Sequence, residues 1–205
     1  MREPQLSITE WISSIASGLT ALAVTAGVWI AWRQLGAWRD QRIGANRADV
    51  AEDLLSHTAE LIGELSSIRS PVGFGPPAGE VDDDGTYDYR RRLQLMGDLH
   101  DRFLELNRLK LRQKAHIASE AADAAIEEIF SVRSEIVVAL RMKINVMSRG
   151  RRYGRELTEK EIARDEEREK VIWEGYDDND QIKARLQSAM NDLETTLLPL
   201  IRLER

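Results

Sequence analysis

The sequence predicts an all-α protein in which a single N-terminal transmembrane helix is followed by an antiparallel cytoplasmic helical bundle. Three observations point to this fold class. A run without any charged side chain covers residues 11–32. Only 6 % of the 205 residues are aromatic, and the abundant Leu, Ala, Glu and Arg favour helices over sheets. After the run, apolar residues recur at intervals of three and four, the period of an amphipathic helix.

The uncharged run from Trp11 to Trp32 is 22 residues long. At about 1.5 Å per residue, such a helix reaches about 33 Å and crosses a hydrocarbon core of about 30 Å. We therefore predict a short exported tail at residues 1–10, a span at 11–32, and a helical domain at 33–205. Aromatic and basic residues favour the headgroup level, and six are predicted as membrane-interface anchors: Trp11, Trp29, Trp32, Arg33, Trp38 and Arg39.

Two other interpretations of the run stay open. A cleaved signal peptide needs a basic start and a small-residue cleavage site, and Ala21–Ala23 could serve as that site. However, the tail carries two glutamates against one arginine, and the apolar stretch continues past Ala23. A buried core helix is the second alternative, because serine and threonine dilute the hydrophobicity of the run.

The charges around the run predict its orientation. One arginine precedes the run, whereas Arg33, Arg39, Arg42 and Arg47 follow it closely. Basic residues near a span stay on the cytoplasmic side. We expect a single-pass protein of a bacterial inner (cytoplasmic) membrane, with its N-terminus out and its C-terminal domain in the cytoplasm.

Four amphipathic helices are predicted after the run. The first ends before Pro71, because the residue before proline avoids the helical conformation. The second and third cover about 87–113 and 119–147, and the pattern leaves open whether they are continuous. The last begins at an acidic cap, residues 177–180. The predicted core positions are Val50, Leu54, Leu61, Leu65, Ile68, Leu93, Met96, Leu99, Phe103, Leu106, Ala122, Ile126, Ile129, Ile136, Leu140, Ile182, Leu186, Met190, Leu193, Leu197 and Leu200.

Three connecting segments have distinct compositions. Residues 70–86 are rich in proline and glycine and predict a loop. Residues 148–156 predict a basic turn broken by glycine. Residues 157–175 begin with a capping box at Thr158 and Glu161 but offer almost no apolar face. We expect this last segment to be a charged, loosely attached, solvated arm.

An antiparallel bundle would bring the loop and the basic turn together at the end furthest from the bilayer. Opposite charges would then lie side by side, which predicts a docking tip for a protein partner. Its residues are Asp82, Asp83, Asp84, Arg149, Arg151, Arg152 and Arg155. An ordinary solvated helix end, where cations are favoured, explains the same arginines without a partner.

The run also has a face of small residues, at the spacing that allows close contact between helices in lipid. This transmembrane association face consists of Ser14, Gly18, Ala21 and Thr25. It predicts a homo-oligomer, although small residues are common in ordinary spans.

No catalytic, cofactor-binding or metal site is predicted. The chain has no cysteine, no Gly-x-Ser-x-Gly motif and no phosphate-binding or dinucleotide-binding glycine loop. His57, His100 and His116 all lack an acidic residue three positions earlier, which a di-metal helical bundle would require. A net charge of −6 argues against nucleic acid as a partner.

These observations predict a membrane-anchored interaction or scaffold protein that presents a cytoplasmic bundle to a protein partner. The alternative is a membrane effector of the toxin or defence type, whose spans oligomerise and perturb the bilayer. An enzyme is not expected, because no catalytic constellation occurs in the sequence. The sequence names neither the partner nor the signal.

Overall fold

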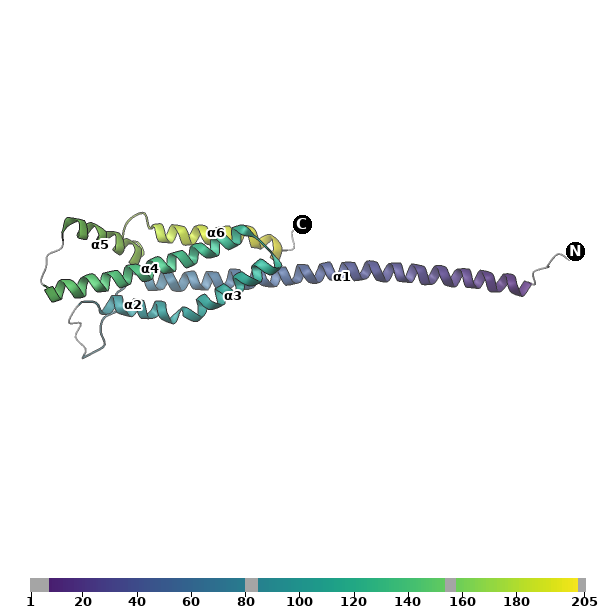
Figure 1. Ribbon diagram of the computed structural model, residues 1–205, viewed down its shortest axis with the longest axis horizontal. Helices are drawn as coiled ribbons and strands as arrows, with labels where there is room; N and C mark the ends of the chain where they lie inside the picture. The colour runs from purple at the N-terminus through teal and green to yellow at the C-terminus, as the bar shows by residue number, and fades with distance from the viewer. Residues whose placement is uncertain (1–7, 80–84, 154–157, 203–205) are drawn as a thin grey trace. The chain divides into compact units, whose positions relative to one another are not determined.

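The computed structural model describes residues 8–79, 85–153 and 158–202 (Figure 1). The protein is 85 % helical, and no strand occurs within these ranges, which confirms the all-α class. The helices are α1 (Ile8–Arg69), α2 (Tyr87–Asp98), α3 (His100–His116), α4 (Glu120–Tyr153), α5 (Glu159–Ile172) and α6 (Gln181–Ile201). The chain forms two compact units, Met1–Ala45 (unit 1) and Asn46–Arg205 (unit 2).

In unit 1, the described residues belong to the first part of α1, and their apolar side chains are exposed. Leu22 is 70 % exposed and Trp32 is 74 % exposed. An 18-residue window of α1 has a mean hydropathy of 1.6, and none of the window is buried. By length and composition this helix can span a membrane, and a signal sequence near the N-terminus has the same properties. The absence of burial in this window argues against the interpretation as a buried core helix.

Unit 2 has one hydrophobic core, to which the second part of α1 and helices α2, α3, α4, α5 and α6 contribute, α5 through its end at Ile172. All 21 predicted core positions are either buried or packed against this core. Partly buried positions such as Leu93 and Met190 lie at its edge. The period of three and four therefore predicted correctly which side of each helix faces inward.

Contacts between α1 and α3 follow the two helices in opposite directions. Arg102, near the start of α3, pairs with Glu64, whereas Arg112, near its end, pairs with the earlier residue Asp53. Figure 1 shows α4 running back along α3, and α6 running back along α4.

The segment predicted as one helix over 87–113 consists of two helices separated at Leu99. A second break separates α3 from α4, so the predicted second and third helices do not form one rod. There Ala118 has a φ of 58°, and its N–H donates to the Gln113 carbonyl oxygen at 2.9 Å. The Gln113 side chain in turn donates to the Ser119 carbonyl oxygen at 2.8 Å, which closes the turn.

The predicted basic turn at 148–156 is wrong over its first part, because α4 continues to Tyr153. Arginine is a good helix former, and a single glycine costs a helix only about 1 kcal/mol. The arginines at 149, 151 and 152 therefore lie on the last turns of a helix.

The expectation that 157–175 is a loosely attached, solvated arm is also wrong. Its capping box exists, since Thr158 N–H donates to the Glu161 carboxylate at 2.9 Å. Helix α5 packs against α4, and Ile172 at its end is buried. The attachment is largely polar, which a search for an apolar face does not detect.

Candidate functional site

The predicted membrane-interface anchors all lie on α1, in unit 1. The four tryptophans are between 57 % and 74 % exposed: Trp11, Trp29, Trp32 and Trp38. The Arg33 guanidinium lies 5.6 Å from the centre of the Trp29 ring, and Arg42 lies 5.6 Å from that of Trp38. Arg39 follows one turn after Leu35 on the same helix. Aromatic and basic groups are thus paired along this segment, and their position in a membrane remains a prediction.

The predicted association face is on the same helix. The Thr25 hydroxyl donates to the Ala21 carbonyl oxygen at 2.8 Å, so it is satisfied within its own helix. A Cβ atom placed on Gly18 would meet no atom within 4 Å. The side chain of Ser14 lies outside the described residues. Self-association through this face remains a prediction.

The predicted docking tip is only partly within the described residues. Asp82, Asp83, Asp84 and Arg155 lie outside them, as do the side chains of Arg151 and Arg152. Arg149 is exposed near the end of α4. The described residues that flank the two segments are neighbours, because a Cβ atom on Gly85 would lie 3.4 Å from Met147 Cε.

The most elaborate constellation in unit 2 is at the end where α1 stops, and it centres on Arg69. The side chain of Arg69 is 1 % exposed. Its Nε donates to the Val171 carbonyl oxygen at 2.9 Å, and its Nη2 donates to the carbonyl oxygens of Lys170 and Trp173 at 3.2 and 3.1 Å. Nη2 also lies 2.9 Å from Asp180 Oδ1. We call Arg69, Asp180 and these three carbonyl groups the Arg69 clamp.

Asp180 is the N-cap of α6 and the acidic member of the clamp. Its carboxylate accepts hydrogen bonds from the N–H groups of Lys183 and Gly175, at 2.9 and 3.1 Å. Burial alone would raise the pKa of Asp180, but these bonds and the Arg69 guanidinium outweigh burial and hold the pKa below its usual value. The carboxylate therefore remains ionised opposite Arg69.

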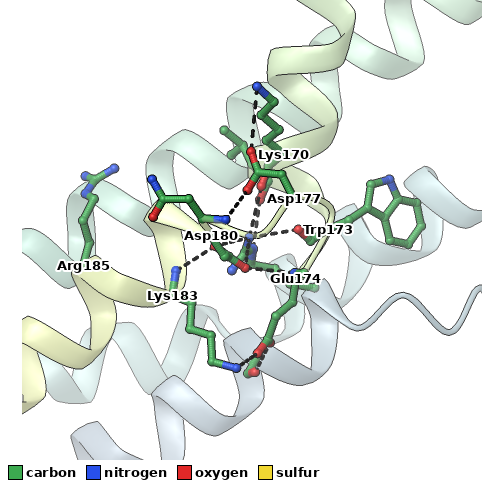
Figure 2. Close-up of polar contacts among 12 residues, drawn as sticks. Lys170, Trp173, Glu174, Asp177, Asp180, Lys183 and Arg185 are labelled. Atoms are coloured by element: carbon green, nitrogen blue, oxygen red, sulfur yellow. Dashed lines mark hydrogen bonds and ion pairs between the residues drawn. The ribbon is translucent and has the colours of Figure 1, made fainter.

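Glu174 closes the clamp from the loop before α6. Its N–H donates to the Arg69 carbonyl oxygen at 2.8 Å, and its carboxylate pairs with Lys183 at 2.8 Å and accepts from Ser66 Oγ. Burial opposes ionisation here too, yet the Lys183 and Ser66 bonds lower the pKa of Glu174. Figure 2 shows Lys183 reaching Glu174 and Lys170 reaching Asp177 around this loop.

A second buried arginine, Arg92 of α2, lies among aromatic rings. Its guanidinium is 4.0 Å from the centre of the Trp173 ring and 5.1 Å from that of Phe74. Asp88 lies 3.2 Å from Arg92 Nε, and the Val72 carbonyl oxygen accepts from Nη2 at 3.1 Å. Arg92 thus holds the start of the loop after α1 against α2.

Helix α5 is attached to α4 by Lys143, which is 9 % exposed. Its ammonium lies 2.5 Å from both Asp165 Oδ2 and Glu169 Oε1. Burial alone would lower the pKa of Lys143, but its hydrogen bonds to the two carboxylates outweigh burial and raise it. Glu169 also accepts from the Tyr89 hydroxyl at 3.0 Å and from the Trp173 indole. Burial, followed by the nearby Glu169 charge, raises the pKa of Tyr89 to about 12.

Most of the charged side chains described above already form ion pairs or hydrogen bonds with one another. A cavity of about 250 Å³ opens beside the loop between α5 and α6. Its charged lining is already engaged, since Arg185 pairs with Glu135 at 2.5 Å and Lys170 lies 3.8 Å from Asp177. Among the described residues no group of three or more His, Cys, Asp or Glu side chains could hold a metal ion. The arrangement holds three chain segments together, and nothing in it activates a nucleophile.

Two acidic residues, Asp53 and Glu60, lie about one turn from His57 on α1, and all three side chains have partners. His57 Nε2 lies 2.8 Å from the Arg102 carbonyl oxygen, while Asp53 pairs with Arg112 and Glu60 pairs with Arg102. These three side chains therefore have separate partners and do not converge on one point.

Sequence reasoning did not find Arg69 or Arg92, because an arginine in a charge-rich helix is normally solvated. The one available signal was the position of Arg69, immediately before the Ser70-Pro71 stop of its helix. A long cation at a helix end can reach carbonyl groups of other segments, but the spacing does not say which ones.

No protein-family model, curated protein or solved structure matches this chain. The function must therefore be argued from the two units themselves.

Proposed function

We propose that the protein is a single-pass membrane anchor of the inner membrane, which holds unit 2 in the cytoplasm as a docking body for a protein partner. One observation carries the proposal. Helix α1 begins as an apolar rod with no buried residue in its hydrophobic window and continues, within one helix, into a well-packed core. A lipid bilayer is the environment that would cover the first part without protein neighbours.

The orientation is supported by the arginines that follow the run. A reporter active only in the cytoplasm, fused after Ile201, should be active in membranes that resist carbonate extraction. The same reporter fused before Ile8 is the matched control and should be inactive, whereas a periplasmic reporter there should be active. A soluble product, or the reverse pattern of activity, would overturn the proposed topology.

The docking function is supported by the exposed Arg149 and by the proximity of Gly85 to Met147, which bound the acidic loop and the basic helix end. Exposed charges mainly set encounter rate and specificity. Changing the basic end to glutamate should weaken partner capture without altering the unfolding of unit 2. The four changes are Arg149→Glu, Arg151→Glu, Arg152→Glu and Arg155→Glu.

Arg108→Glu is the control for this charge reversal, since the Arg108 side chain is 73 % exposed on α3 and lies outside the tip. Equal loss of capture with the control would show that overall charge, not the tip, governs docking. A large drop in the stability of the fourfold variant would show that the arginines have a structural role.

A membrane effector is the second candidate, favoured by the open space around Gly18 on a helix with no covering neighbour. Its distinguishing property is dye release from vesicles that contain the full chain. Intact vesicles at high protein density would leave the docking function as the better proposal.

A further inference from the structure

A groove lies on α1 around the end of the apolar run. It has a volume of about 520 Å³ and is lined by Trp29, Trp32, Arg33, Leu35, Gly36 and Arg39. Gly36 lies among the lining residues, and the space above it is open, since a Cβ atom there would meet no atom within 4 Å. Two indole rings and a leucine supply the apolar wall, and two arginines supply the polar rim. All of these residues belong to unit 1.

The two arginines give the rim of the groove a positive charge. Within the described part of the chain, neither Arg33 nor Arg39 forms an ion pair, and no acidic side chain lines the groove. Arg33 instead lies over the Trp29 ring at 5.6 Å. A cation held against an apolar wall suits a ligand that is anionic at one end and apolar at the other.

The position of the groove along the helix axis indicates which ligand would bind there. Gly36 lies four residues beyond Trp32, about 6 Å along the helix axis. The headgroup layer on each side of a bilayer is about 5–7 Å thick. If residues 11–32 cross the hydrocarbon, the groove therefore lies at the level of the lipid phosphates, with its apolar wall toward the acyl chains.

We propose that this groove binds an anionic phospholipid, with the phosphate against Arg33 and Arg39 and an acyl chain along Trp29, Trp32 and Leu35. The inference rests on the proposed membrane span and adds a lipid class to it. Its consequence is that the anchor selects acidic lipids on one side of the bilayer, in addition to being retained by hydrophobicity.

The test uses the full-length protein in phosphatidylcholine vesicles that contain either spin-labelled phosphatidylglycerol or spin-labelled phosphatidylcholine. The fraction of motionally restricted label gives the preference of the protein for the anionic lipid. Wild type should prefer phosphatidylglycerol. Arg33→Gln and Arg39→Gln should each reduce this preference by up to about fivefold, the factor for one basic residue at an anionic surface.

Two glycine variants separate the groove from general surface charge. Gly36→Leu should fill the groove and lower the preference, whereas Gly44→Leu, also in open space on the same helix, should leave it unchanged. Both changes favour the helix, since leucine is a better helix former than glycine, so a loss of lipid preference would not reflect a loss of folding.

Three results would count against the proposal, and they are distinguishable. Protein that is washed from the vesicles by carbonate would overturn the membrane span and this inference together. Inserted protein without a preference for phosphatidylglycerol would overturn the lipid site alone. Loss of preference in the arginine variants but not in Gly36→Leu would show that charge acts without a groove, and would also overturn the site.

Discussion

Helix α1 contains two leucines in opposite environments, and the contrast describes the whole molecule. Leu22 in unit 1 is 70 % exposed, whereas Leu61 in unit 2 is 0 % exposed. Both have the same propensity and belong to one continuous helix. What differs is the neighbourhood, because unit 2 supplies five further helices, whereas the described part of unit 1 contains only the first part of α1. The local sequence therefore determines that the helix forms, whereas the neighbouring helices determine whether its apolar side chains are buried.

The two units also differ in how they treat charge. The apolar run of unit 1 has no charged residue, and most of the arginines of this unit follow its end. Unit 2 instead takes Arg69 and Arg92 into its interior, at 1 % and 0 % exposure. A buried charge must be paired and hydrogen-bonded, and both arginines meet that condition with carbonyl and carboxylate oxygens. Buried ion pairs thus attach segments that have too little apolar surface of their own.

The largest effect should come from breaking the Arg69 clamp. Arg69→Met would leave Asp180 buried without its cation and three carbonyl groups without a donor. We expect unit 2 to lose about 3–5 kcal/mol of unfolding free energy, the usual cost of removing one partner of a buried pair. Urea unfolding of the full chain in detergent, followed by circular dichroism, measures this loss.

Arg102→Met is the control for the clamp. Arg102 pairs with two glutamates but is 38 % exposed, so solvent screens these pairs and its loss should cost much less stability than the loss of Arg69. Similar losses for the two variants would mean that the clamp stabilises no more than a surface ion pair does.

The next effect compares the two leucines directly. Leu61→Ala should destabilise unit 2 by about 2–5 kcal/mol, because it leaves a cavity in a packed core. Leu22→Ala should leave the unfolding of unit 2 unchanged, since the run contributes nothing to that core. The same urea titration measures both. A comparable loss with Leu22→Ala would show that the apolar run packs on the bundle and would remove the case for a membrane span.

The parts of the fold that depend on periodicity could be predicted from the sequence. Positions such as Leu54, Ile129 and Leu193 follow from the spacing of three and four, and all are buried. The caps at Thr158 and Asp180 follow from local chemistry, and both exist. These features depend on neighbours within one or two turns, which a sequence pattern contains.

Long-range polar contacts could not be predicted. Arg69 meets Asp180 across 111 positions, and Lys143 meets Asp165 across 22. No local sequence pattern relates such residues. The segment 157–175 has almost no apolar face and was therefore predicted to be loosely attached, although α5 packs against α4. The prediction of where α4 ends was wrong for a different reason. One glycine among arginines destabilises a helix too little to end it.

A smaller effect should appear at high pH, through Tyr89. Its pKa in the folded state is raised from 10.0 to about 12. The unfolded chain therefore loses this proton at a lower pH than the folded chain does, so stability is complete below pH 10 and falls as the pH rises toward about 12. Tyr89→Phe should make this alkaline loss of stability shallower, and urea midpoints measured from neutral pH upward test it.

Tyr176→Phe is the control for this pH dependence, because Tyr176 is 51 % exposed. Lys143, whose pKa is also raised, should keep part of the alkaline slope in both variants. If stability fell equally steeply with pH in wild type and Tyr89→Phe, the ionisation of the Tyr89 hydroxyl would not contribute to the alkaline loss of stability.

The smallest effect should be found within the apolar run, which we propose to span the membrane. If two spans associate through Gly18, Ala21 and Thr25, close approach of their backbones supplies dispersion and weak hydrogen bonds worth about 1–2 kcal/mol. A Cβ atom at position 18 has open space within 4 Å, so we expect Gly18→Leu to disturb mainly a contact with a second copy. Leu19→Ala, outside the small face, should change association little. A membrane-association reporter that carries residues 1–40 compares the two variants. Equal signals from wild type and Gly18→Leu would mean that the small face is filler, and any oligomer would then have to form through unit 2.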